Sequence, residues 1–185
     1  MEDWQIVSLY WQRDERAITE TEQKYGAFCH RIAQNILGIP QDAEECVNDT
    51  YLQAWRAMPP QRPQWLGAWL GKVVRNLALN LWTKHHRQKR YAGMEEILHE
   101  LEDCLPASNA VEQQVEAEEL TEAINRWLEA LPREDRILFL RRYWYGEASK
   151  TLARERGVSP GNLAKRMYRL RQRLKAALEQ EGYVL

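Results

Sequence analysis

The chain of 185 residues is predicted to be all-α, with two small helical domains joined by an acidic linker. Apolar residues recur at three- and four-residue intervals, which is the spacing of one face of a helix. All seven prolines fall where such a periodic segment would begin or end, and none interrupts one. Strand-like alternation bounded by turn dipeptides is absent from the sequence, which leaves helices as the expected elements.

The first half of the chain contains three periodic segments, which we expect to form one domain over residues 1–92. The first covers about residues 14–37 and is followed by glycine and proline, which end helices. The second covers about residues 41–58, and the third about residues 65–91. The predicted buried stripe of the third consists of Trp69, Val73, Leu77 and Leu81.

The second half begins with an acidic linker over residues 93–115, in which we expect one weak helical turn near residues 95–101. Helical periodicity resumes near Glu116 and is interrupted by Pro132. A further helix covers about residues 133–144. The C-terminal domain is therefore predicted to span residues 116–185.

The segment from Ala148 to Gln180 is predicted to be a helix-turn-helix. Gly157 supplies the turn, and Ser159 followed by proline starts the second helix with an N-cap hydroxyl. Between Lys150 and Lys175 there are nine Lys or Arg residues and one acid. A basic second helix after a short turn is typical of a helix that enters the DNA major groove. A plain helical hairpin with a solvated face, or a membrane-surface or calmodulin-type helix, has the same pattern.

Charge is strongly clustered although the net charge is only −1. Residues 62–91 carry seven Lys or Arg and no acid, and residues 92–125 carry ten acids and no Lys or Arg. Residues 126–185 carry fourteen Lys or Arg and seven acids. Two basic blocks separated by an acidic one are the pattern that a nucleic-acid-binding surface produces.

The sequence contains no catalytic or metal-binding constellation. Its three cysteines and four histidines lack pairing or metal-ligand spacing, so we expect no catalytic residue, metal, cofactor or small-molecule substrate, and no enzymatic activity. The sparse cysteines fit a reducing compartment. We find no signal peptide and no run long enough for a membrane span, which predicts a cytoplasmic protein without membrane contact.

Three sets of side chains are candidates for binding. The first is an acidic helix face that suits a basic partner or is simply solvated, formed by Asp42, Glu45, Asp49 and Gln53. The second lies on the third helix, where Lys72 and Arg75 attract phosphates and Asn76 and Asn80 lie one turn apart. The asparagines are equally compatible with a plain helix surface. The third set, on the basic helix, is Asn162, Lys165, Arg166 and Arg169. Arg141, Arg142 and Lys150 are further candidates for phosphate contacts, and the alternative is that they belong to a solvated helix face.

Four stretches in this order resemble the extracytoplasmic-function (ECF) subfamily of bacterial RNA polymerase sigma factors. They are DAEECVNDTYLQAW (42–55), WLGKVVRNLALNLW (69–82), LPREDRILFLRRYWYG (131–146) and the helix-turn-helix itself. The resemblance departs from the family at Thr151, where an acid is usual, and at Asn162-Leu163-Ala164, where Thr-Val and a basic residue are usual.

The resemblance implies a transcription initiation factor whose partners are core RNA polymerase and promoter DNA, with an anti-sigma factor as a further partner. It implies that core polymerase binds the acidic face together with its closing aromatic, Trp55. For the minus-ten element the implied residues are Arg62, Lys72, Arg75, Asn76 and Asn80. For the minus-thirty-five element the base-facing positions are Ala164, Lys165, Tyr168 and Arg169, which joins Ala164 and Tyr168 to the third set.

Two rival hypotheses remain at this point. The chain could be a stand-alone helix-turn-helix regulator that binds duplex DNA as a dimer, with the first domain as a sensor. It could also be a helical enzyme or scaffold. The second basic helix speaks against the regulator, and the lack of a catalytic constellation speaks against the enzyme.

Overall fold

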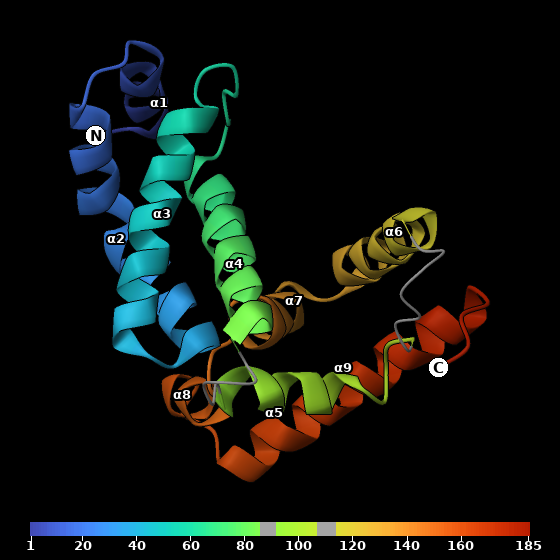
Figure 1. Cartoon of the computed structure of the whole chain (residues 1–185). Helices are drawn as coiled ribbons and strands as arrows, with labels where there is room; N and C mark the ends of the chain where they lie inside the picture. The colour runs from blue at the N-terminus through green and yellow to red at the C-terminus, as the bar shows by residue number, and fades with distance from the viewer. Residues whose placement is uncertain (86–91, 107–113) are drawn as a thin grey trace. The chain divides into compact units, whose positions relative to one another are not determined.

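The computed structural model describes residues 1–85, 92–106 and 114–185, and across these residues it contains helices and no strand (Figure 1). The all-α prediction is thus confirmed. The chain divides into two compact units, Met1–Met94 and Glu95–Leu185. The predicted domain boundaries at residues 92 and 116 remain predictions.

The first unit contains α1 (Asp3–Trp11), α2 (Arg16–Leu37), α3 (Pro40–Ala57) and α4 (Leu66–His85). Helices α2, α3 and α4 pack against one another, and α1 contacts α2 and α4. Helix α1 was not predicted, yet it buries Ile6, Val7 and Tyr10 in the core. Helix α2 is terminated by Gly38, which directly follows Leu37 and has a φ of 69° that glycine reaches easily.

The buried face of α4 differs from the predicted one. The structure fully buries Leu66, Leu70, Val74 and Ala78, whereas the predicted stripe that begins at Trp69 is only half-buried. Because α4 contacts α1, α2 and α3, apolar residues occur on more than one side of the helix. Spacing then predicts the helix correctly but does not select the side that is most deeply buried.

A single carboxylate connects α1 to the start of α4. The Leu66 backbone N–H donates to Asp3 Oδ2 at 3.0 Å, and Asp3 Oδ1 accepts from Lys24 Nζ at 2.7 Å and from the Tyr25 hydroxyl at 2.5 Å. The first N–H groups of a helix have no partner within the helix. Asp3 therefore caps α4 from a distance of 63 residues along the chain.

The second unit contains most of α5 (Ala92–Leu101), then α6 (Gln114–Ala130), α7 (Arg133–Phe139), a π-helical segment (Leu140–Trp144), α8 (Ser149–Glu155) and α9 (Pro160–Gln180). Helix α5 has ten residues, whereas the sequence predicts one weak helical turn within the acidic linker. Ile97, on α5, is fully buried. Burial of Ile97 thus stabilises a helix in a segment whose acidic composition is typical of a linker.

The predicted helix-turn-helix is confirmed as α8, a turn and α9. Gly157 in the turn has a φ of 64°, and the Ser159 hydroxyl oxygen accepts from the Asn162 backbone N–H at 3.2 Å. Helix α9 buries one apolar stripe whose members recur at three- and four-residue spacing: Leu163, Met167, Leu170, Leu174 and Leu178.

Candidate nucleic-acid interface

Helix α9 carries its predicted base-facing residues on the side opposite the buried stripe. Ala164, Lys165, Tyr168 and Arg169 are all exposed, and the Tyr168 side chain is 54% exposed. Asn162 is also exposed and lies in the first turn of the helix. The periodicity that buries the leucines therefore produces one continuous outward face with two positive charges and an aromatic ring. Such a face can meet base edges and phosphates together.

Arg166 lies apart from that face. Its Nε donates to Asp135 Oδ1 of α7 at 2.8 Å, and its Nη2 lies 2.7 Å from the same oxygen. Glu134 of α7 is 3.7 Å from the same Nη2. These contacts connect α9 to α7, so Arg166 is already engaged within the protein, and its contact with DNA stays a prediction.

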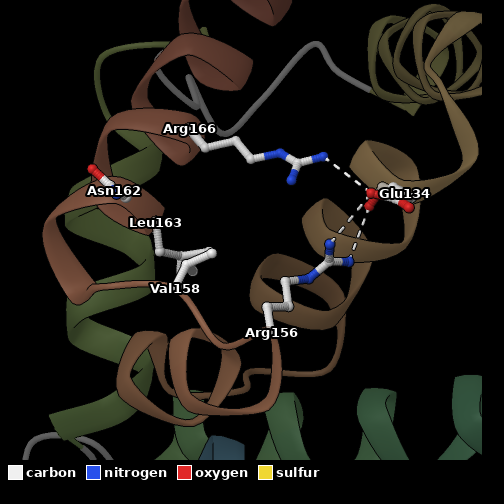
Figure 2. A pocket seen from close by; sticks show the side chains of 6 residues that line it. All are labelled: Glu134, Arg156, Val158, Asn162, Leu163 and Arg166. Carbon is white, nitrogen blue, oxygen red and sulfur yellow. Dashed lines mark hydrogen bonds and ion pairs between the residues drawn. The ribbon is translucent and has the colours of Figure 1, made fainter.

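A pocket of about 400 Å³ opens between the start of α7 and the α8–α9 turn (Figure 2). In Figure 2 the guanidinium groups of Arg156 and Arg166 point toward Glu134 from two different elements. The remaining wall consists of Val158, Asn162 and Leu163. The pocket therefore borders the outward face of α9 through Asn162.

Of the three side chains considered as phosphate contacts, two form ion pairs within the protein. Arg142 is only 1% exposed, and its Nη2 donates to Glu100 of α5 at 2.6 Å, so the prediction that it contacts phosphate is wrong. Arg141 Nη2 donates to both Glu147 and Glu155 at 2.5 Å. The hydrogen bonds that Arg141 donates to these carboxylates raise its pKa. Lys150 is exposed.

Helix α4 presents a second candidate surface, in the first unit. Lys72, Asn76 and Asn80 are exposed and follow one another at four-residue intervals, so they form a single line along the helix. Arg75 is half-buried, and this burial lowers the pKa of its guanidinium. Arg62 is exposed and lies 5.3 Å from the centroid of the Trp11 ring, in a cation–π contact.

The predicted acidic face of α3 is only partly exposed. Glu45, Asp49 and Gln53 are exposed, but Asp42 is 7% exposed, so the expectation that all four share an open face is wrong at Asp42. Asp42 occupies the first turn of α3, where a carboxylate is stabilised by the helix dipole.

Trp55, the closing aromatic of that predicted face, packs in the first unit. Its ring contacts Tyr10 edge-on at a centroid distance of 6.2 Å, and Arg13 lies 5.4 Å from its centroid. Asn80 of α4 and the acids Glu45 and Asp49 line a common groove of about 200 Å³. The two predicted surfaces of the first unit therefore adjoin each other at Asn80.

Sequence reasoning missed the two charged residues that shape the α9 pocket, Glu134 and Arg156. The nearest signal is the sequence Arg133-Glu134-Asp135-Arg136, which puts two acids in the first turn of α7. Arg156, the partner of Glu134, lies 22 residues further along the chain, and Arg166, the partner of Asp135, lies 31 residues further. Helical periodicity does not predict contacts over such separations.

Within the residues that the structure describes, no helix is long and apolar enough to cross a membrane. The same residues contain no cluster of three His, Cys, Asp or Glu side chains that could hold a metal ion.

Two family models match the chain. The model of sigma-70 region 2 matches residues 23–88, and the model of sigma-70 region 4 matches residues 121–174. The first therefore covers α3 and α4 with their polar faces, and the second covers α7 to α9 with the pocket and most of α9.

Three curated relatives carry related names. The "Probable RNA polymerase sigma factor RfaY" of Xanthomonas campestris pv. campestris is 28% identical, with 86% of this chain matching 41% of that protein. The ECF RNA polymerase sigma factor SigE of Mycolicibacterium smegmatis is 25% identical over 83% of this chain and 58% of its own length. The ECF RNA polymerase sigma factor SigL of Mycobacterium tuberculosis is 24% identical over 86% of this chain and 87% of its own length. The chain thus spans less than two thirds of the first two relatives.

Among solved structures, the chain is similar to one described as "Structure of CnrH in complex with the cytosolic domain of CnrY". The identity is 20% and the TM-score is 0.44, with 97% of this chain and 99% of that chain covered.

Proposed function

The chain belongs to the ECF subfamily of RNA polymerase sigma factors, and we propose that it directs transcription initiation by binding core polymerase and by recognising and melting promoter DNA. The observation that carries the proposal is that one chain has two exposed polar faces, one on α4 in the first unit and one on α9 in the second. Sigma factors are generally non-enzymatic, and binding energy alone would drive promoter opening, so the chain needs no catalytic residue.

The assignment of the surfaces follows from their chemistry. The outward face of α9 suits a major groove, because Lys165 and Arg169 can donate to guanine and Tyr168 offers apolar contact. The line of Lys72, Asn76 and Asn80 suits an unwound strand, since amides reach base edges and lysine attracts phosphate. Residues 1–92 would then bind core polymerase and the minus-ten element, and residues 116–185 would bind the minus-thirty-five element. Residues 93–115 would be the linker between these two domains.

The exposed acids Glu45 and Asp49 on α3 are proposed to dock on a basic surface of core polymerase. An anti-sigma factor that competes for these faces would be a further partner, as is common in the subfamily. The polymerase works in the cytoplasm, and the proposed function places this chain there.

In vitro transcription with core polymerase tests the proposal. Sequencing the transcripts that the wild-type chain initiates would identify its promoter. Asn76→Ala is expected to reduce open-complex formation on that promoter about tenfold, because a buried base edge would lose its partner, while assembly with core polymerase stays unchanged.

Asn76→Ala and Asn80→Ala together should likewise reduce open-complex formation while assembly with core polymerase stays intact. Asn80→Ala is the stricter test of this separation, because Asn80 adjoins the acids of α3. If Asn76→Ala weakened assembly with core polymerase as much as it weakened DNA opening, the assignment of α4 would be wrong. If the chain bound duplex DNA strongly yet initiated no transcription with core polymerase, it would act as a stand-alone regulator instead.

A further inference from the structure

We propose that the pocket between α7 and the α8–α9 turn binds a phosphate of the DNA backbone and that Glu134 occupies this site until DNA displaces it. This inference rests on the proposed function, because it assigns a second contact to the DNA-binding unit. Its residues are Glu134, Arg156 and Arg166, together with Asn162 at the rim (Figure 2). Neither Glu134 nor Arg156 is among the binding residues predicted from the sequence.

The guanidinium of Arg156 has unused hydrogen-bonding capacity. Its Nη1 lies 3.9 Å from Glu134 Oε2, and its Nη2 donates to the backbone oxygen of Glu134 at 3.3 Å. Its Nε is buried and has no hydrogen-bond partner within the described part of the chain. A guanidinium in a saturated ion pair has partners at about 2.7–2.9 Å. Arg156 is therefore a donor group that is held in place but poorly satisfied.

The second arginine is satisfied on one edge only. Asp135 accepts from Arg166 Nε at 2.8 Å and lies 2.7 Å from Nη2, which fixes the plane of the guanidinium. Glu134 lies 3.7 Å from that same Nη2, beyond hydrogen-bonding distance. Asp135 therefore holds Arg166 in position with positive charge still facing the pocket.

Glu134 is the weak member of this cluster. Its carboxylate is 3.9 Å from one guanidinium and 3.7 Å from the other, and its side chain is 78% exposed. Ion pairs of this exposed kind contribute little to stability, so the side chain can swing into solvent at small cost. Without it, Arg156 and Arg166 would be balanced only by Asp135, the carboxylate that pairs with Arg166, and the three groups together would carry a net charge of +1.

A DNA phosphate matches this vacated position in charge, geometry and location. It carries one negative charge, and its oxygens accept two parallel N–H bonds from an arginine. The N-terminus of α9 adds the positive end of a helix dipole beside Asn162. Because Asn162 belongs both to the pocket and to the exposed side of α9, a duplex on the α9 face would bring its backbone to the pocket.

The contact would set the register of the duplex without reading its sequence, as phosphate contacts do. Glu134 would act as an internal competitor that lowers affinity for all DNA equally. Removing it would tighten binding in a sequence-independent way. This is the opposite of what is expected for a residue that merely stabilises the fold.

The test measures closed-complex affinity of the holoenzyme on its promoter over a range of salt concentrations. Arg156→Gln is expected to weaken binding about tenfold and to reduce the slope of log K against log salt by about 0.9, the loss of one phosphate contact. Glu134→Gln is expected to tighten binding several-fold. Both changes should be the same on a promoter whose minus-thirty-five bases are replaced.

Two further variants make the test specific. Glu129→Gln removes the same charge from an exposed position of α6 that does not line the pocket, and it should leave affinity nearly unchanged. In the double variant Glu134→Gln/Arg156→Gln, the gain from Glu134→Gln should disappear, because the phosphate would lack its donor. Thermal unfolding of each variant shows whether a change in affinity reflects loss of folding.

The proposal is overturned if Glu134→Gln tightens binding no more than Glu129→Gln, or if its gain persists without Arg156. It is also overturned if inorganic phosphate shifts the side-chain N–H resonances of Arg156 in the full chain while no variant changes DNA affinity, since the site would then take a free anion. If the wild-type chain initiated no transcription with core polymerase, the proposed function would fail by itself. Salt-dependent binding of the free chain to random duplex would still test the pocket.

Discussion

Glu100 of α5 organises an ionic cluster in the interior of the second unit. Its carboxylate accepts from Arg142 Nη2 at 2.6 Å and from the Tyr143 hydroxyl at 2.7 Å, and Arg171 Nη1 lies 3.4 Å away. Burial alone would raise the pKa of Glu100, but the hydrogen bonds from Arg142 and Tyr143 outweigh it and lower the pKa below its ordinary value of 4.5. The ionised form is thus favoured in the folded state.

This shift predicts acid sensitivity of the second unit. A carboxylate with a lowered folded pKa contributes stability that is fully present above its unfolded pKa and is lost as the pH falls through the folded value. The unfolding free energy from urea titration should therefore fall as the pH drops below about 4.5. Glu100→Gln should cost about 2 kcal/mol at pH 7, because buried Arg142 loses the nearer of its two carboxylate partners and keeps only Glu96 at 3.1 Å. The variant should also flatten the acid limb. An acid limb as steep in this variant as in the wild type would contradict the assignment.

The same cluster shows why single residues were predicted less well than helices. Arg142 seemed free for DNA because its sequence neighbours are basic or apolar. Its carboxylate partners, Glu96 and Glu100, both lie on α5, and the nearer one in sequence is 42 residues earlier. Arg166 meets Asp135 across 31 residues. Lys165 and Arg169 of α9 are exposed, as their spacing from the buried leucines indicates, but helical spacing contains no information about ion pairs between helices.

At the scale of elements, Asp3 predicts a dependence of α4 on the chain terminus. Asp3→Ala removes the acceptor for the Leu66 N–H and for Lys24 and Tyr25, so it should lower the unfolding free energy of the first unit by about 1–2 kcal/mol. Glu2→Ala removes the neighbouring exposed carboxylate, which takes part in the cap of α1, so it measures what the loss of the α1 cap alone costs. Equal losses in the two variants would show that Asp3 acts only through α1 and not as a cap of α4.

The elements themselves were predictable where a helix has one polar and one apolar side. Helices α2, α3 and α9 meet that condition and were predicted within two residues at each boundary. Helix α1 was missed because apolar residues, from Trp4 to Trp11, surround most of its nine-residue length and leave no clear polar face. Helix α5 was underestimated because its acids dominated the composition, whereas buried Ile97 anchors it.

At the scale of the whole molecule, the proposed function requires two units whose surfaces act at different steps. The acids Glu45 and Asp49 lie in the first unit, and the outward residues Lys165 and Arg169 lie in the second. All four are exposed, so changing them should leave both cores intact. Their effects should therefore separate cleanly between assembly with polymerase and recognition of DNA.

We expect Glu45→Lys/Asp49→Lys to weaken assembly with core polymerase at least tenfold, because like charges would face the basic docking surface. Lys165→Ala/Arg169→Ala should assemble normally but lose about tenfold or more in closed-complex affinity for the promoter. Competition for core polymerase against the labelled wild-type chain measures the first quantity, and promoter binding by preassembled holoenzyme measures the second. If the α9 variant also failed to assemble, the second unit would be part of the polymerase contact. If the α3 variant assembled normally, the acidic side of α3 would be a solvated surface, and core polymerase would have to bind the first unit elsewhere.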